Sequence, residues 1–301
     1  MSKPSPSPPP SNFDLQAIRS ECIRIIKADS RHFQIIIFLF LLPISLPLVF
    51  FQVFPIKTLI SNLLYTLTIP ILSLLGTGST AYSVSHGFHG RQVKLSSSMK
   101  AAFTSFFPLL STWLVTQLII SGIGLILGLA FFSLFKATQV LVFQVDYSSA
   151  YFILLCLAYI ISLVFIVVYL QVNWIFAYAI VVVESSWGLE PLKRSQALVK
   201  GIKGVAFKVV LFLGFFCWLG IWSSMLRFVE PAGDAWKIGA SFIQIVTVPA
   251  ASYYPLFMFY NLVVNTVLYM NSKAVHGEFA GEHVSLLSDD DGEVAHVVSI
   301  V

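Results

Sequence analysis

Six long apolar runs dominate the chain, and shorter polar segments separate them. The runs extend over residues 33–54, 59–82, 103–135, 151–183, 207–228 and 238–269. Each run contains at least about 20 residues, which is the length that a helix needs to cross the roughly 30 Å hydrocarbon core of a bilayer. The pattern therefore predicts an all-α integral membrane protein built as a six-transmembrane-helix bundle.

The fourth run is too long for one simple crossing. Its residues 151–183 would extend roughly 50 Å as a helix, at 1.5 Å per residue. We expect the turns from about Asn173 onward to leave the hydrocarbon and enter the cytosolic interface.

Two polar segments have the pattern of basic amphipathic helices. In residues 12–30, apolar side chains recur at helical spacing, with basic residues on the other faces. The segment between the fourth and fifth runs has Pro191 in its first turn, where proline is tolerated, and its apolar side is formed by Leu192, Val199 and Ile202. Both segments are predicted to lie as interfacial helices on the cytosolic side.

The second of these helices carries the candidate contacts to anionic headgroups of the cytosolic leaflet, or to a protein partner: Lys193, Arg194, Lys200 and Lys203. An alternative remains open, in which these charges only set the orientation of the chain. For the first helix, the alternative is a cytosolic extension of the first span.

The composition supports the membrane interpretation. Hydrophobic residues make up 57% of the 301 residues and charged residues only 11%, whereas a soluble domain carries roughly 25% charged residues. So few charges cannot cover the surface of a soluble domain of this length. The remaining apolar surface must therefore face lipid.

The basic residues predict the orientation. With the N-terminus in the cytosol, 14 of the 18 Lys and Arg residues lie on the cytosolic side. The opposite side then holds Lys57, Lys136, Arg227 and Lys237. Under the positive-inside rule this distribution predicts that both termini are cytosolic. The net charge of +4 thus reflects membrane topology, and we expect no nucleic-acid partner.

The two ends of the chain differ from the membrane domain, which is expected at residues 12–271. Residues 1–11 form a Pro/Ser-rich tail that is predicted to be disordered, and residues 272–301 form an acidic cytosolic tail. In the acidic tail, Glu282, Leu286 and Leu287 have the form of an acidic dileucine sorting signal, which coat adaptors read. Such short patterns also arise by chance.

The predicted spans contain few groups that could carry chemistry. No Asp, Glu, Lys, Arg or His lies in the middle of a span, which argues against ion-coupled transport. Asn261 and Asn265 share one helix face and would either hydrogen-bond between helices or line a polar cavity. Gly124 and Gly128 form a GxxxG pattern for helix packing, within the bundle or in a dimer.

No catalytic, cofactor or metal site is predicted. His86 and His89 are three residues apart and could bind a metal, but no third ligand is evident. A solvated loop is the favoured interpretation of this pair.

Two stretches resemble a known group of membrane proteins. Leu192–Ser195 followed by Ala197–Gly201 is similar to an "ALKRS…LVKG" loop, and Ile18–Leu42 is similar to the start of the same group. This multispanning family includes the membrane domain of some glycerophosphodiester phosphodiesterases, related bacterial inner-membrane proteins, and plant proteins without an assigned activity. The resemblance implies the six-span layout. It does not imply catalysis, because no segment here resembles the phosphodiesterase domain.

These observations favour a non-enzymatic multi-pass protein of the endomembrane system or plasma membrane, with a trafficking, scaffold or lipid-environment role. The first alternative is a transporter or channel for a neutral or lipid-like substrate, which needs a continuous polar cavity. A lipid-modifying enzyme ranks last, because it needs a cluster of His, Asp or Glu and only His86 and His89 are available. The sequence does not specify the oligomeric state.

Overall fold

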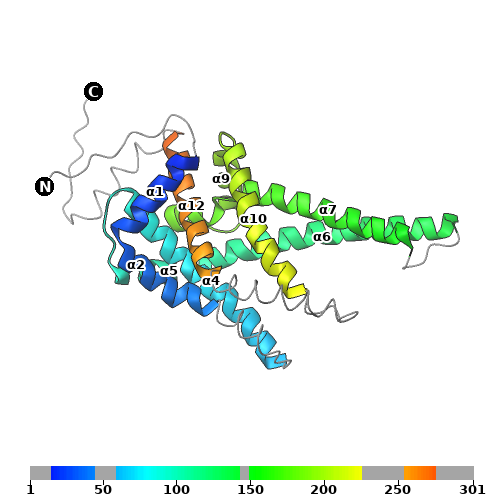
Figure 1. The fold of residues 1–301 in the computed structure, drawn as a ribbon, viewed down its shortest axis with the longest axis horizontal. Helices are drawn as coiled ribbons and strands as arrows, with labels where there is room; N and C mark the ends of the chain where they lie inside the picture. Colours follow the sequence, from blue (N-terminus) through cyan, green and yellow to red (C-terminus); the bar gives the residue numbers. More distant parts are fainter. Residues whose placement is uncertain (1–14, 45–58, 143–148, 226–253, 276–301) are drawn as a thin grey trace, which may run out of the picture.

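Helices account for all the regular structure in the residues that the structure describes. The computed structural model describes residues 15–44, 59–142, 149–225 and 254–275. Its elements are α1 (Leu15–Ala28), α2 (Ser30–Ile36), the π-helical turn η1 (Ile37–Leu41), α4 (Leu59–Phe88), α5 (Leu95–Thr104), α6 (Phe106–Val142), α7 (Ala150–Asn173), α8 (Ala177–Glu184), α9 (Glu190–Val199), α10 (Lys203–Met225) and α12 (Tyr254–Val275) (Figure 1). The predicted all-α class is confirmed.

Three helical segments in this part of the chain are long and apolar enough to cross a membrane. They are Leu67–Phe88, Phe106–Val140 and Ala150–Glu184. A shorter apolar helix covers Ser30–Ile44. Parts of the predicted first and sixth spans lie outside the described residues, and the count of six spans stays a prediction.

Two of the predicted runs are interrupted. The third run divides at Ser105, between α5 and α6. Pro108 has no N–H to bond the carbonyl of Thr104, so α6 starts anew and holds this proline in its first turn, where it is tolerated.

The fourth run divides after Asn173, close to the position where we expected it to leave the hydrocarbon. Residues 174–176 form a turn between α7 and α8. Ser195 of α9 compensates for the lost helical bonds, because its Oγ donates to the carbonyl of Asn173 (2.8 Å) and accepts from the amide of Phe176 (3.2 Å). A hydroxyl from another helix therefore stabilises the break.

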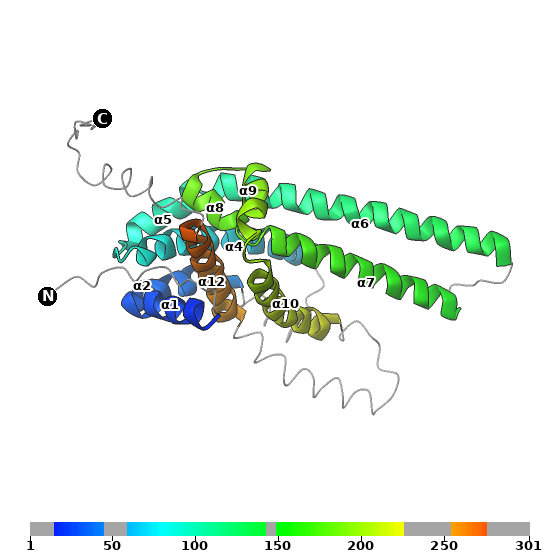
Figure 2. The ribbon, with the colours of Figure 1, turned by 90° about the horizontal axis from the view of Figure 1, so that it is seen from above.

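α6 and α7 form a long hairpin that projects from the other helices (Figures 1 and 2). Almost none of its central side chains is buried. Leu118 of α6 is 71% exposed and Phe165 of α7 is 75% exposed, and other large apolar side chains of both helices are similarly exposed. An apolar surface of this extent is covered by lipid or by another protein in a stable molecule.

The core lies at the base of the hairpin, where α12 and α4 pack against α1, η1, α8 and α9. Its largest fully buried side chains include Tyr269 and Phe176, whose ring centroids are 6.0 Å apart. Residues near both ends of the described chain, such as Ile18 of α1 and Met270 of α12, also meet in this core.

The two amphipathic helices contribute their apolar faces to this core. In α1, Ile18, Cys22 and Ile25 are buried, and in α9, Leu192 and Val199 are buried. Burial raises the pKa of the Cys22 thiol to about 12, so this group stays protonated. The apolar faces are as predicted, but protein covers them and they are not available to enter lipid. The interfacial position of both helices stays a prediction.

Close packing around α4 depends on glycine. A Cβ atom on Gly78 would lie 3.1 Å from the Cα atom of Ala102 in α5, and one on Gly76 would lie 3.2 Å from Leu41 in η1. A Cβ atom on Gly122 of α6 would meet nothing within 4 Å. The tight approaches are therefore at α4 and not along the hairpin.

We expect Gly78→Leu to lower the free energy of unfolding by about 1–3 kcal/mol, because the added side chain must displace the backbone of α5. The control is Gly122→Leu, which has open space around it and gains helix propensity. Thermal unfolding of the detergent-solubilised protein, followed by tryptophan fluorescence, measures both variants. Equal unfolding midpoints for the two would contradict the packing argument.

Candidate functional site

The exposed side of α9 carries a row of basic residues. Lys193, Gln196, Ala197 and Lys200 follow helical spacing and are exposed, and Lys203 is exposed at the start of α10. We call Lys193, Lys200 and Lys203 the α9 basic face. These three of the four predicted headgroup candidates are oriented for outside contacts.

The turn that precedes α9 adds exposed apolar residues to this surface. Trp187 is 65% exposed and Leu189 is 53% exposed. Ser185 and Gly188 have positive φ angles, of 54° and 73°, which reverse the chain between α8 and α9. The amide of Gly188 donates to Oγ1 of Thr112 at 3.1 Å, which fixes the turn to α6. Cations beside an exposed tryptophan are typical of the membrane–water interface.

Arg194, the fourth candidate, contacts its own chain. Its Nε donates to Oε2 of Glu184, at 3.3 Å. Arg194 therefore differs from the three lysines, because its guanidinium is partly neutralised by a carboxylate at the end of α8.

Glu184 also contacts α12, and we call Glu184, Arg194, Tyr269 and Lys273 the Glu184 cluster. The hydroxyl of Tyr269 donates to Oε1 of Glu184 at 2.8 Å, and the Nζ of Lys273 lies 3.7 Å from the same oxygen. Lys273 is only 7% exposed. A single carboxylate thus joins α8, α9 and α12 and faces a buried ammonium group.

Sequence reasoning missed this cluster. Tyr269 and Lys273 are four residues apart on one helix face, which is a detectable signal. The partner Glu184 is 85 residues away from Tyr269 in the sequence, and no local pattern connects them. Lys273 falls in the predicted acidic tail, residues 272–301, where no sequence pattern gives it a buried partner.

Hydroxyl groups hold α9 in place beside the cluster. Ser195 fills the break between α7 and α8, and Oγ of Ser272 donates to the carbonyl of Leu198 at 2.9 Å. Both serines are fully buried. The buried side of α9 is therefore fixed at its middle and near its C-terminal end, and its basic face keeps a defined orientation.

Asn261 and Asn265 bond to each other. Nδ2 of Asn265 donates to Oδ1 of Asn261 at 2.7 Å, within α12. Oδ1 of Asn265 is buried and has no hydrogen-bond partner among the described residues. The shared face is as expected, but this bond lies within one helix and does not join two.

Gly124 and Gly128 lie on the side of α6 that faces α7. The hydroxyl of Tyr159 donates to the carbonyl of Gly124 at 3.4 Å. A Cβ atom on Gly124 would be 3.8 Å from Leu163, and one on Gly128 would be 3.8 Å from Tyr159. These are ordinary contact distances, so the GxxxG pair lies within the hairpin without bringing its helices unusually close.

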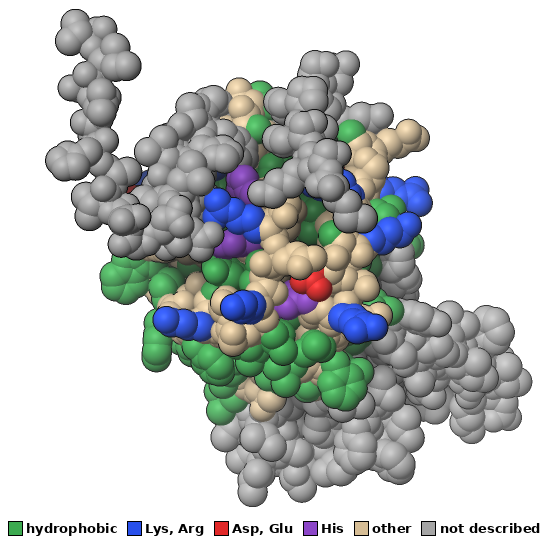
Figure 3. Space-filling view, turned by 90° about the vertical axis from the view of Figure 1, so that its left-hand side faces the viewer, with side chains coloured by type: hydrophobic (Ala, Val, Ile, Leu, Met, Phe, Trp, Pro, Cys, Tyr) green, Lys and Arg blue, Asp and Glu red, His purple; other side chains and the backbone are tan. Residues whose placement is uncertain are grey.

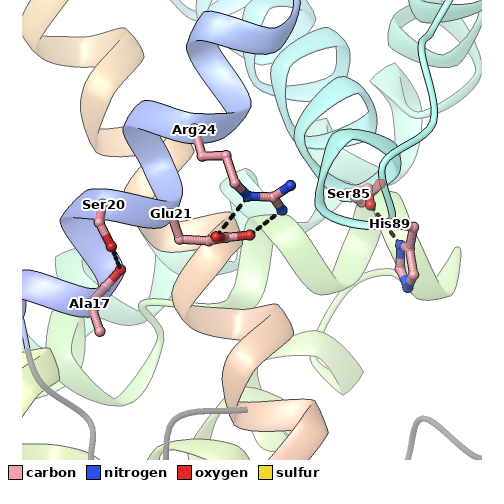
Figure 4. Close-up of polar contacts among 6 residues, drawn as sticks. All are labelled: Ala17, Ser20, Glu21, Arg24, Ser85 and His89. Atoms are coloured by element: carbon pink, nitrogen blue, oxygen red, sulfur yellow. Dashed lines mark hydrogen bonds and ion pairs between the residues drawn. The ribbon is translucent and has the colours of Figure 1, made fainter. Parts of the chain in front are cut away.

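His86 and His89 do not form the expected solvated loop: both are half-buried, His86 lies within α4, and His89 follows directly after it. Both rings bond to backbone. Nδ1 of His86 lies 3.0 Å from the carbonyl of Tyr82, and Nδ1 of His89 lies 2.8 Å from that of Ser85 (Figure 4). Among the described residues there is no group of three side chains that could hold a metal ion.

A third histidine has a more unusual environment. His32 of α2 is buried, and its Nε2 lies 2.9 Å from Oγ of Ser83 in α4. Oγ of Ser83 also lies 3.0 Å from Oγ of Ser98 in α5. Oγ of Ser98 in turn lies 2.6 Å from Oγ of Ser79 in α4. This buried polar network joins three helices and was not predicted.

The tail residues Glu282, Leu286 and Leu287 lie outside the described residues, as do residues 1–11. The sorting signal and the disordered N-terminal tail therefore stay predictions.

Comparison with known families gives one match. The model of a domain of unknown function, DUF8558, matches residues 54–290, and the chain belongs to this family. No curated protein and no solved structure matches the chain. The matched region includes the α9 basic face and the Glu184 cluster, whereas α1 and α2 precede it.

We expect Glu184→Gln to lower the free energy of unfolding by about 1–3 kcal/mol, because it removes the charge that faces buried Lys273. The control is Glu21→Gln, which breaks the more exposed pair with Arg24 and should cost less than about 1 kcal/mol. Unfolding in detergent measures both variants.

A second change tests the mechanism behind that loss. Adding Lys273→Gln to Glu184→Gln removes the buried cation and should recover part of the stability. If Glu184→Gln and Glu21→Gln have the same effect, the cluster does not stabilise the junction.

Proposed function

We propose that this member of the DUF8558 family is a non-enzymatic multi-pass membrane protein that organises lipids or partners at the cytosolic leaflet. In this proposal six helices cross the bilayer and both termini are cytosolic. The α9 basic face contacts anionic headgroups. The membrane belongs to the endomembrane system or is the plasma membrane.

The α6–α7 hairpin supports the membrane part of this proposal. The hairpin arms α6 and α7 contain 37 and 24 residues, so the shorter arm corresponds to about 36 Å of helix. This length exceeds the roughly 30 Å hydrocarbon core, so the hairpin can cross the bilayer and still reach the core of the molecule. Its bare apolar side chains would then contact lipid.

The headgroup part rests on the position of α9 at the base of this hairpin (Figure 2) and on the exposure of the lysines of its basic face. Ser195 of α9 bonds the end of α7 directly. The exposed lysines, and the exposed Trp187 in the turn before α9, would therefore meet the headgroup layer where the hairpin leaves the hydrocarbon. Because the apolar side of α9 is buried in protein, the helix would act through its charges and not by insertion.

The transporter alternative would use the Asn261 and Asn265 pair. The partnerless oxygen of Asn265 is the observation that favours it, because a buried amide oxygen accepts a bond from water or from a polar substrate. Transport requires a continuous polar path through the membrane, and the Asn261 and Asn265 pair supplies polar groups at one position of such a path. Contact with headgroups is the preferred function, because the three exposed lysines of the α9 basic face and the exposed Trp187 support it.

We predict that replacing Lys193, Lys200 and Lys203 together by Gln reduces the preference of the protein for phosphatidylserine over phosphatidylcholine. Each cation near an anionic surface contributes about 1 kcal/mol, so most of the preference should be lost. Native mass spectrometry of protein released from mixed-lipid nanodiscs measures the lipids that stay bound.

The matched control replaces Lys57, Lys136 and Lys237 by Gln, which removes the same charge from the side predicted to face away from the cytosol. This control should retain its bound phosphatidylserine. Equal losses in the two triple variants would contradict a specific role for the α9 basic face.

The trafficking part of the proposal has its own prediction. Leu286→Ala combined with Leu287→Ala should move a fluorescently tagged protein to another membrane compartment, because coat adaptors would no longer bind the tail. The control is Val297→Ala combined with Val298→Ala, in the same tail. An unchanged location of the dileucine variant in living cells would remove the sorting signal from the proposal.

A further inference from the structure

A cavity of about 130 Å³ lies between α1, α2, the end of α4 and the segment that follows α4. Its polar lining consists of Arg24, Asp29, His32, Ser83, Arg91 and Gln92. The volume is well above the about 10–15 Å³ that a single water molecule needs. The cavity therefore has room for a small polar group together with water.

Two arginines from different parts of the chain face this space. Arg24 comes from α1, and Arg91 comes from the segment between α4 and α5. Glu21 binds Arg24 through Nε and Nη2 and fixes its orientation toward the end of α4 (Figure 4). A guanidinium has five N–H donors, so this pairing leaves further donors on Arg24.

The other lining groups suit an acceptor-rich ligand. Gln92 supplies amide donors, and the buried pair of His32 and Ser83 supplies neutral polar groups at 2.9 Å from each other. Burial lowers the pKa of His32, so its ring is neutral near pH 7 and contributes hydrogen bonding, not charge.

The charges around the cavity favour an anion over a cation. Asp29 is the one acidic residue in the lining, against two arginines, although Glu21 outside the lining offsets part of the charge of Arg24. A metal ion would meet one carboxylate and two positive charges, which is an unfavourable site. Nearby Lys and Arg side chains add to the positive potential on this face of the molecule (Figure 3).

We propose that this cavity binds a phosphate group, supplied either by a lipid headgroup or by a small soluble phosphate. Arginine presents paired donors that match the oxygens of phosphate, and the cavity offers two arginines and further polar groups around one small volume. This site is separate from the α9 basic face, and it does not require that face to bind lipid.

Part of the site lies outside the family match. Ser83 and the segment from Gly87 to Val93 belong to residues 54–290, whereas Arg24, Asp29 and His32 precede them. Docking of α1 and α2 onto the end of α4 therefore completes the site. The N-terminal helices would thus supply a binding function in addition to core packing.

The test uses the full-length protein in a phosphate-free, uncharged detergent. Isothermal calorimetry is performed with inorganic phosphate and with dioctanoyl phosphatidic acid, and dioctanoylglycerol is the probe without phosphate. Binding of inorganic phosphate shows that a phosphate group without a lipid is sufficient for binding. Binding of the phosphatidic acid alone identifies a lipid headgroup, and binding of neither phosphate probe overturns the proposal.

Arg91→Gln should weaken binding of the active probe by roughly tenfold or more, since charge-assisted hydrogen bonds are lost. Arg91→Lys keeps the charge without the paired donors and should weaken it less. The control is Lys94→Gln, an exposed cation three residues away that does not line the cavity. If Lys94→Gln weakens binding as much as Arg91→Gln does, the binding is non-specific and the proposal fails.

Discussion

The apolar surface of the α6–α7 hairpin is the constraint on which the rest of the structure depends, because water cannot solvate it at low cost. The polar side chains along the hairpin are compatible with a lipid surrounding. Ser162 donates to the carbonyl of Ala158 at 2.7 Å, Thr116 donates to that of Thr112 at 2.8 Å, and Ser133 donates to that of Leu129. Each hydroxyl is satisfied within its own helix, as a hydrocarbon environment requires. Polar interactions between helices are instead concentrated at the base of the hairpin.

At that base the helix breaks, and a buried side chain of another helix supplies the hydrogen bonds that the break removes. The carbonyl of Asn173 and the amide of Phe176 lose helical bonds and bond Ser195 instead. Glu184 follows one short helix later, and it holds Arg194 and Lys273 within reach of one carboxylate. The break and the carboxylate together orient α9. The orientation of the α9 basic face is therefore a consequence of where the apolar run ends.

Local patterns in the sequence predicted the all-helical class and the apolar faces of α1 and α9, and they placed the end of the fourth span near Asn173, where the structure has a break. These features depend on hydrophobic periodicity, which is readable within a few turns. The partners of Ser195 and Glu184 were not predictable, because they lie 10 or more positions away in the sequence and no local pattern identifies them. The same limit applies to glycine. The GxxxG spacing of Gly124 and Gly128 indicated close packing, but the closer approach is at Gly78, where α5 happens to lie against α4.

The positive-inside rule counts all cytosolic Lys and Arg residues together, but in the folded structure some are paired with carboxylates and others are exposed. Arg24 is paired with Glu21, and Arg194 and Lys273 are paired with Glu184, so their fields are partly cancelled within the chain. Lys193, Lys200 and Lys203 lie exposed on the other side of the same junction. Orientation during insertion depends on all of these charges, because pairing arises only after folding. Attraction of an anionic headgroup depends on the potential that remains in the folded state. Glu184 therefore keeps Arg194 and Lys273 for the fold, whereas Glu21 orients Arg24 and leaves further donors of its guanidinium for a ligand.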